Sequence, residues 1–424
     1  MTGHLTRRGL VAGLAASAAA VAAGPRAFAQ AAPRIVVVGG GFGGATAARF
    51  AKRLMPAADV TLIEPAATYM ACPFSNLVIA GLRELEDQAF GYAGLETAGV
   101  RLVRDRAGDI DPVQRIVALG NGSDLAYDRL ILSPGVDLRW GALEGYEPGA
   151  EAAMPHAWKA GEQTQRLRRQ LEAMEDGATV VMSAPAAPYR CPPGPYERAS
   201  LIAHYLKTQK PRSKLILLDA KDSFSKMPLF MEAWAAHYGD HLEWRGASND
   251  GRVSRVDPGA MTLETDFETF SADVANVIPP QKAAAIAERA GVSDQTGWCP
   301  VDATSFESTL QPNIHVIGDA AIAAPMPKSA FSANLQGKLC AMAVVRLLSG
   351  LEAEPTVLAN TCYSYVSPDA AVSIAGVYRN RDGRFAGIED AGGISPLDAP
   401  EAVRSAEARE AEAWFRAITA ETFG

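Results

Sequence analysis

The chain has 424 residues, enough for two or three domains, and its hydrophobic fraction of 48% with a mean hydropathy near zero predicts a soluble globular protein. It carries 40 Lys and Arg against 48 Asp and Glu, and this net charge of −8 argues against nucleic-acid partners and anionic membrane surfaces. The five cysteines and six histidines form no CxxC or CxxCH motif and no His/Cys cluster. We therefore expect no metal site and no covalently bound c-type haem in this chain.

Residues 1–29 have the features of an export signal. Arg7 and Arg8 precede an Ala-rich apolar run, and Ala27-Phe28-Ala29 matches an A-x-A cleavage site. The apolar run is short for a membrane span, so cleavage is favoured over anchoring. Paired arginines are typical of the twin-arginine route. The sequence therefore predicts a periplasmic protein that starts near Gln30 and has no membrane span in its mature part.

A strand, a glycine-rich turn and a helix open the predicted fold. The β-branched run Ile35–Val38 predicts a buried strand. Three glycines follow it in GxGxxG spacing: Gly39, Gly41 and Gly44. The first permits a tight turn, the second lets the backbone approach a pyrophosphate, and the third lets the helix pack close to the strand. The next strand, Asp59–Ile63, ends in Glu64, whose carboxylate can accept hydrogen bonds from a ribose, so this unit predicts a dinucleotide site.

The segment after Glu64 leaves the carboxyl end of the second strand, the edge where open α/β sheets bind ligands. Cys72 lies in this loop, so it is either close to the nucleotide or a buried structural thiol. Short strands are predicted at 101–103 and 115–119. A strand that starts near Tyr127 and ends at Pro134-Gly135 is typical of the point where a flavin-binding domain passes to the next domain.

A second βαβ unit is predicted from strands at Thr179–Met182 and Lys214–Asp219 and a helix between them from about Pro195 to Thr208. A further helix, 163–174, precedes it. The turn after the first strand is rich in proline where glycines would be needed to bind a pyrophosphate. Because proline lacks an N–H donor, we expect a Rossmann-like domain that does not bind NAD.

The chain then returns to the first domain through a strand at 273–279. A later strand ends in Gly318-Asp319, where an acid can bind the sugar-alcohol chain of a flavin or cap a turn. A helix follows at 332–348, and the last unit combines a strand at 372–378 with a helix at 399–419. We therefore predict an α/β protein of the FAD-dependent disulfide-reductase architecture: residues 30–149 and 273–350 form the FAD domain, 150–272 a second Rossmann-like domain, and 351–424 a C-terminal α+β domain.

With these motifs in place, the chain resembles the flavoprotein subunit of flavocytochrome c sulfide dehydrogenase, a relative of the sulfide:quinone oxidoreductases. The segments that carry the resemblance run over most of the chain: VVVGGGFGGATAA, PHAWKAGEQT, PPGPYERAS, GWCPVD, VIGDAAIAAPMPKS and NTCYS. The resemblance implies FAD bound covalently through Cys72 in a Tyr-x-x-Cys loop. It also implies a redox disulfide between Cys191 and Cys362, and a separate c-type cytochrome subunit that holds the haem.

The implied chemistry is oxidation of sulfide by the disulfide, which passes two electrons to the flavin. The flavin then passes single electrons to the haem. Cys191 precedes a predicted helix, whose N-terminus favours a thiolate. Glu197, in the first turn of that helix, is either a catalytic base or an acid that stabilises the helix. Cys340 is either a packed thiol or a competitor for pairing, and Cys299 is expected to be structural.

Three other functions stay open from the sequence. A quinone-reducing relative is disfavoured because the C-terminal stretch 401–423 is acidic and mixed rather than apolar. A nicotinamide-dependent disulfide reductase is disfavoured by the proline-rich turn. An exported FAD-binding scaffold that only docks a cytochrome is the non-enzymatic alternative, and loss of turnover in a Cys191→Ser variant would argue against it.

Overall fold

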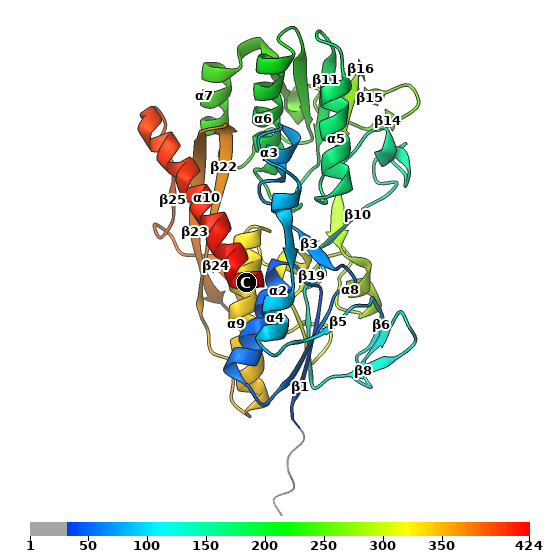
Figure 1. Cartoon of the computed structure of the whole chain (residues 1–424), viewed down its shortest axis with the longest axis vertical. Helices are drawn as coiled ribbons and strands as arrows, with labels where there is room; N and C mark the ends of the chain where they lie inside the picture. The colour runs from blue at the N-terminus through cyan, green and yellow to red at the C-terminus, as the bar shows by residue number, and fades with distance from the viewer. Residues whose placement is uncertain (1–31) are drawn as a thin grey trace, which may run out of the picture.

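The computed structural model describes residues 32–424, so the predicted export signal lies outside the described residues. Figure 1 shows two layered units, one above the other, with the C-terminal hairpin and the last helix running beside both. Each unit is built on a parallel sheet with helices against it. The predicted α/β class with two Rossmann-like units and a C-terminal α+β part is confirmed.

The first sheet has five parallel strands in the order β20-β9-β1-β2-β5. Their bounds are β1 Arg34–Val38, β2 Asp59–Ile63, β5 Arg101–Val103, β9 Arg129–Leu132 and β20 Ile314–Val316. β20 comes far later in the chain than the others, so the chain leaves this unit and returns to it. Helices α2 (Phe42–Leu54) and α9 (Ala330–Leu348) pack against each other beside this sheet (Figure 1).

The second sheet has four parallel strands in the order β13-β12-β11-β17. Their bounds are β11 Thr179–Ala184, β12 Lys214–Asp219, β13 Leu242–Arg245 and β17 Val274–Val277. The helices of this unit are α5 Glu162–Ala173, α6 Gly194–Gln209 and α7 Met227–His237. Most of these strand residues are buried, as expected for parallel strands covered on both faces.

Shorter elements fill the loops between these units. Two antiparallel meanders are present: β6 Ala107–Asp111, β7 Ile116–Leu119 and β8 Asp124–Ala126, then β14 Arg255–Asp257, β15 Thr262–Glu264 and β16 Thr269–Ser271. Paired short strands are β3 Thr68–Met70 with β4 Ala89–Gly91, β10 Val136–Leu138 with β18 Gln281–Ala283, and β19 Cys299–Pro300 with β21 Ala321–Ile322. Short helices are α3 Ser75–Ile79, α4 Ala93–Thr97 and α8 Ala285–Arg289.

The C-terminal part is an antiparallel sheet covered by a long helix. Its strands are β22 Val357–Ser367, β23 Ala370–Arg381, β24 Arg384–Gly387 and β25 Gly393–Ile394, and the helix is α10 Glu401–Phe423. β22 contacts α6 and α7 of the second unit and α9 of the first, so it joins both. Within residues 32–424, none of the helices combines the length and apolar character needed to cross a bilayer.

Candidate functional site

A cavity of about 520 Å³ lies where the two units and the C-terminal sheet meet. It is lined by the glycine turn after β1, the loop from β3 to α3, the turn before α6, and parts of β22 and α10. Of the ten site residues predicted from the sequence, nine line it: Gly39, Gly41, Glu64, Cys72, Cys191, Glu197, Gly318, Asp319 and Cys362. The tenth, Gly44, packs behind the turn.

The glycine turn brings the start of α2 close to the end of β1. Gly39 has a φ of +97°, which favours glycine, and its N–H donates to the carbonyl of Ile63 over 3.0 Å. A Cβ on Gly44 would lie 1.9 Å from the carbonyl oxygen of Gly39, so only glycine lets the helix pack here. No side chain caps α2 at Gly41, so the first N–H groups of this helix remain available to an anion in the cavity.

Two carboxylates lie at the ends of strands of the first sheet. Glu64 accepts hydrogen bonds from the N–H of Gly40 over 2.8 Å and of Ala66 over 2.9 Å, and its oxygens keep lone pairs for a ribose. One carboxylate oxygen of Asp319 is buried and has no hydrogen-bond partner within the part of the chain that the structure describes. A hydroxyl of a bound ligand would satisfy it. The glycine turn, Glu64 and Asp319 therefore fit a flavin dinucleotide.

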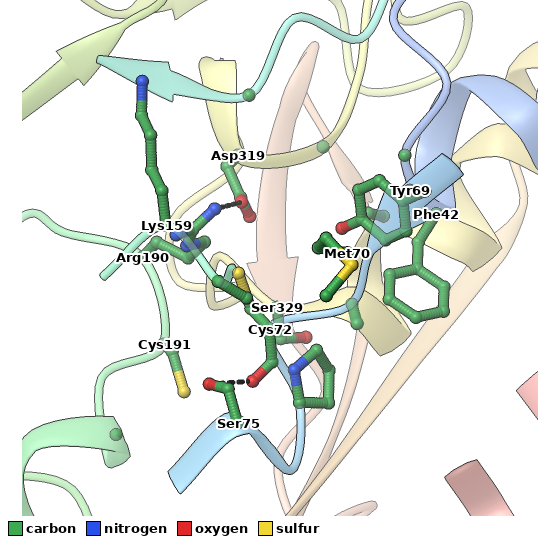
Figure 2. A pocket seen from close by; sticks show the side chains of 18 of the residues that line it. Phe42, Tyr69, Met70, Cys72, Ser75, Lys159, Arg190, Cys191, Asp319 and Ser329 are labelled. Atoms are coloured by element: carbon green, nitrogen blue, oxygen red, sulfur yellow. Dashed lines mark hydrogen bonds and ion pairs between the residues drawn. The ribbon is translucent and has the colours of Figure 1, made fainter. Parts of the chain in front are cut away.

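Arg190 lies between Asp319 and Trp158 in the wall of the cavity. Its guanidinium lies 3.9 Å from the second carboxylate oxygen of Asp319 and also donates to the carbonyl of Trp158 (Figure 2). Burial raises the pKa of Asp319, and the nearby Arg190 and Lys328 act against this rise. Arg190 was missed from the sequence because it stands next to Cys191 in a segment that we interpreted as a turn.

Cys72 follows β3 and lies in the same cavity. Its thiol is half-buried and points to the carbonyl of Trp158, with the sulfur 3.8 Å from that oxygen. The preceding Tyr69 is held by aromatic contacts with Phe42 and Phe423, whose ring centroids lie 5.5 and 5.4 Å away. Figure 2 shows Cys72, Tyr69 and Cys191 around one space. The Tyr-x-x-Cys loop therefore lines the same cavity as the glycine turn.

The other two cavity cysteines come from different units. Cys191 lies in the turn before α6, with a φ of +57°, and its N–H donates to the carbonyl of Lys328 over 2.8 Å. Cys362 lies on β22, and its sulfur accepts a hydrogen bond from the side-chain amide of Asn360 over 3.3 Å. Both are free thiols that line the same cavity. The structure therefore brings together two sulfurs that are far apart in the sequence.

The expectation that the start of α6 favours a thiolate at Cys191 is wrong for this free thiol. Burial raises the pKa of Cys191, and the nearby Cys362 and Glu197 raise it further. Arg190 and Lys226 act in the opposite direction but do not outweigh burial. The helix-terminal effect is small beside the cost of ionising a group in apolar surroundings.

Glu197 joins three segments of the molecule. One carboxylate oxygen accepts from the N–H of Tyr365 on β22 over 2.8 Å, and the other accepts from the side-chain amide of Asn76 on α3 over 2.7 Å. Both bonds leave α6, so Glu197 does more than cap its own helix. Burial raises the pKa of this carboxyl, and the two hydrogen bonds act against the rise. A carboxyl with a raised pKa in the cavity that holds two thiols can accept and return a proton.

Two buried cations beside the sulfurs were not found from the sequence. Lys226, only 3% exposed, donates to the carbonyls of Cys362 and Val372 and to the hydroxyl of Ser364, over 3.0, 3.2 and 2.8 Å. Arg198 lies in α6 and lines the cavity. Lys226 gave no signal because it lies in a polar loop. A charge inside the mostly buried helix α6 was the signal that could have identified Arg198.

The remaining cysteines are packed thiols. Cys299 and Cys340 are fully buried in the hydrophobic core around the first sheet, and neither lines the cavity. Burial raises the pKa of both. Cys340 therefore does not compete for pairing with the cavity cysteines in this structure. Over residues 32–424, no cluster of His, Cys, Asp and Glu side chains could hold a metal ion.

Three family models match successive parts of the chain. The pyridine nucleotide-disulphide oxidoreductase model matches residues 33–181, the central model of the sulfide dehydrogenase [flavocytochrome c] flavoprotein chain matches 164–279, and the flavocytochrome c sulphide dehydrogenase flavin-binding model matches 354–423. The sulfide dehydrogenase flavoprotein chain of Chlorobaculum thiosulfatiphilum is 56% identical over 45 residues, which are 11% of this chain and 94% of that sequence.

Longer matches are more distant. The mitochondrial sulfide:quinone oxidoreductase of Mus musculus is 24% identical over 297 residues, which cover 67% of this chain and 65% of that protein, just under two thirds of its length. Among solved structures, the sulfide:quinone oxidoreductase from Aquifex aeolicus aligns over 92% of both chains, with a TM-score of 0.69 and 18% identity. At this identity the likeness concerns the fold alone.

Proposed function

Because this chain belongs to the family of flavocytochrome c sulfide dehydrogenase flavoprotein chains, we propose that it oxidises sulfide through a Cys191–Cys362 disulfide and bound FAD and passes the electrons to a c-type cytochrome subunit. The observation that carries this proposal is the placement of both cysteines in the cavity that the glycine turn and Asp319 also line. A disulfide there would lie next to a flavin held by those groups.

The side chains of the cavity support a specific chemical role for the two cysteines and for Glu197. Hydrosulfide attacks one sulfur of the disulfide, so that a persulfide forms on one cysteine and the other leaves as a thiolate. Glu197 can accept the proton of that persulfide, because it lines the same cavity and burial raises the pKa of its carboxyl. When bound, FAD accepts the electron pair and releases single electrons.

Packed side chains cover the carboxyl end of β12 in the second sheet. Asp219, at the end of β12, is fully buried and accepts from the hydroxyl of Tyr196 over 2.7 Å and the indole of Trp244 over 3.2 Å. Lys221 forms an ion pair with it over 2.5 Å, and Tyr196 stacks on Phe224 with ring centroids 3.5 Å apart. These side chains support the proposal that no NAD binds here.

We propose that FAD is attached to Cys72. The test is acid denaturation of the purified protein followed by peptide mass mapping. We expect the yellow flavin to stay with the polypeptide, on the peptide that contains Cys72. A Cys72→Ala variant should release all of its flavin, whereas Cys340→Ala, which changes a thiol outside the cavity, should retain it. Free flavin from the wild-type protein would contradict the covalent link.

The second candidate is a sulfide:quinone oxidoreductase, favoured by the long match to the mouse protein. Steady-state assays with sulfide and either a c-type cytochrome or a short-chain quinone separate the two functions. We expect reduction of the cytochrome to be the faster reaction. Faster reduction of the quinone would favour the second candidate.

Export to the periplasm is part of the first proposal, and cell fractionation of Arg7→Lys, Arg8→Lys double variants tests it.

A further inference from the structure

Arg198 is a buried cation whose hydrogen-bond partners are all neutral. It is 2% exposed. Its guanidinium donates to four oxygens: the side-chain oxygens of Asn76 and Asn276, both over 3.0 Å, and the carbonyls of His156 and Ala157, over 2.9 and 2.6 Å. Across residues 32–424, no carboxylate lies within ion-pair distance of it. The nearest acid in this network, Glu197, is separated from it by Asn76, which binds both.

A buried charge without a partner of opposite charge is costly in a folded protein. Arg198 also lines the cavity that holds Cys191 and Cys362. A guanidinium has five N–H groups, and four are donated in the bonds above, which leaves one on the same nitrogen that binds Ala157. Within residues 32–424, one N–H of Arg198 therefore has no acceptor, and its charge faces the ring of Trp158, 5.0 Å away at the centroid, but no carboxylate within ion-pair distance.

The charged side chains around the two sulfurs carry an excess of positive charge. Lys226 is a second buried cation, but its three N–H groups are all donated to oxygens around β22, so it contributes charge and no free donor. Glu197 is the acid that faces the cysteines, and Arg190 is offset by Asp319. Burial lowers the pKa of His156 to about 3, so this neighbour is neutral. Glu407 also acts on Lys226 but is paired with Arg404, so the two remaining cations against one acid leave room for one anion.

We propose that Arg198 binds the sulfur anion of the substrate beside Cys191 and Cys362. The assignment rests on the proposed function, because it identifies the residue that selects hydrosulfide over neutral H₂S at the same site. The remaining N–H of Arg198 and its charge attract a small anion, and the other four N–H groups hold the guanidinium rigidly in the wall. The substrate class that fits is a small sulfur anion rather than a neutral thiol.

The test compares an anionic and a neutral alkylating reagent on the reduced, flavin-loaded protein. Iodoacetate and iodoacetamide react with the same thiolates, so the ratio of their rates at Cys191 and Cys362, followed by peptide mass mapping, reports local charge. Clefts lined by one sign of charge raise local counter-ion concentration by at least about tenfold, so Arg198→Met should lower this ratio about tenfold. Arg198→Lys, which keeps the charge, should retain most of the ratio.

The control is Arg212→Met, which removes an exposed arginine paired with Asp176 and makes the same change in net charge. A ratio for Arg198→Met equal to that of Arg212→Met would overturn the proposal. A measurement on the wild-type protein alone guards against a variant that fails to fold. Sodium azide, a source of a small anion, should slow alkylation of Cys191 by neutral iodoacetamide, and no slowing up to saturating azide would also overturn it.

The outcome is separable from that of the proposed function. If sulfide fails to reduce the flavin of the wild-type protein, the proposed function is wrong, whatever the alkylation ratio shows. If sulfide reduces the flavin but the ratio does not respond to Arg198→Met, only the assignment of Arg198 fails. Where both hold, Arg198→Met should raise the KM for sulfide about tenfold and change kcat much less.

Discussion

At the scale of single residues, the two cavity cysteines have different surroundings. Cys191 lies beside the carboxyl of Glu197, and burial raises the pKa of its thiol. The sulfur of Cys362 accepts a hydrogen bond from Asn360, and the carbonyl of Cys362 accepts one from Lys226. The donors around Cys362 suit a sulfur that leaves with negative charge. Under the proposed function, we therefore expect hydrosulfide to attack Cys191.

The protonation of Glu197 gives a prediction for stability. Because burial raises its pKa, the folded protein binds more protons than the unfolded chain between the ordinary pKa of a glutamate and the raised value. Folding stability therefore falls as the pH rises through this window. Glutamine cannot ionise, so the unfolding free energy of Glu197→Gln minus that of the wild type should increase as the pH rises from about 4.3. Urea denaturation at several pH values measures it.

The control for this prediction is Glu162→Gln, which changes an exposed acid in α5 whose side chain is 77% exposed. Its effect on unfolding free energy should be small and nearly constant with pH. A difference between Glu197→Gln and the wild type that shrinks as the pH rises would contradict the raised pKa. The same variant should oxidise sulfide about 100-fold more slowly, as expected when a general base is lost.

The residues of the candidate site divide into those with a local signal and those without one. Gly39, Glu64 and Asp319 could be predicted because each stands at a fixed place after a strand, and the structure puts all three around the cavity. Lys226 could not, because its role depends on contacts with a segment far away in the chain, and the signal for Arg198 was only a charge inside a mostly buried helix. The pairing of Cys191 with Cys362 came from the resemblance and stays a prediction.

At the scale of elements, the close packing of α2 on the glycine turn gives a second prediction. A Cβ at Gly44 would meet the carbonyl of Gly39 at 1.9 Å, so Gly44→Ala must push the helix away from β1. We expect a loss of about 1–3 kcal/mol of unfolding free energy, as for overpacked sites, together with weaker FAD binding. Gly387→Ala, with open space around the added Cβ, should change neither. Equal effects of the two substitutions on flavin content would contradict this account.

The elements themselves were predicted unevenly. The parallel strands β2 and β12 were predicted with their observed bounds, and β1 was predicted one residue short at its start, because continuous apolar runs are typical of strands buried on both faces. β22 was missed. Its sequence mixes Asn, Thr, Cys and Ser with apolar residues, and its burial does not alternate, since it contacts helices of both units. The strand that carries Cys362 is thus set by tertiary packing rather than by a local pattern.

At the scale of the whole molecule, the cavity exists only where three parts of the chain meet. Glu197 in α6 forms hydrogen bonds with residues of both α3 and β22. Lys226, at the start of α7, forms a hydrogen bond with β22. Figure 1 shows the C-terminal hairpin running alongside both units. Cys362 on its strand β22 lines the same cavity as Cys191 in the turn before α6. The sulfur chemistry proposed here therefore depends on the assembled fold and on no single unit.

The measurement that tests this account most directly is an anaerobic titration of the flavin-loaded protein, followed by the visible absorbance of the flavin. We predict that sulfide alone bleaches the wild-type flavin, that NADH alone does not, and that sulfide leaves the flavin of Cys191→Ser oxidised. Reduction by NADH or NADPH but not by sulfide, or a Cys191→Ser variant that bleaches as fast as the wild type, would contradict it.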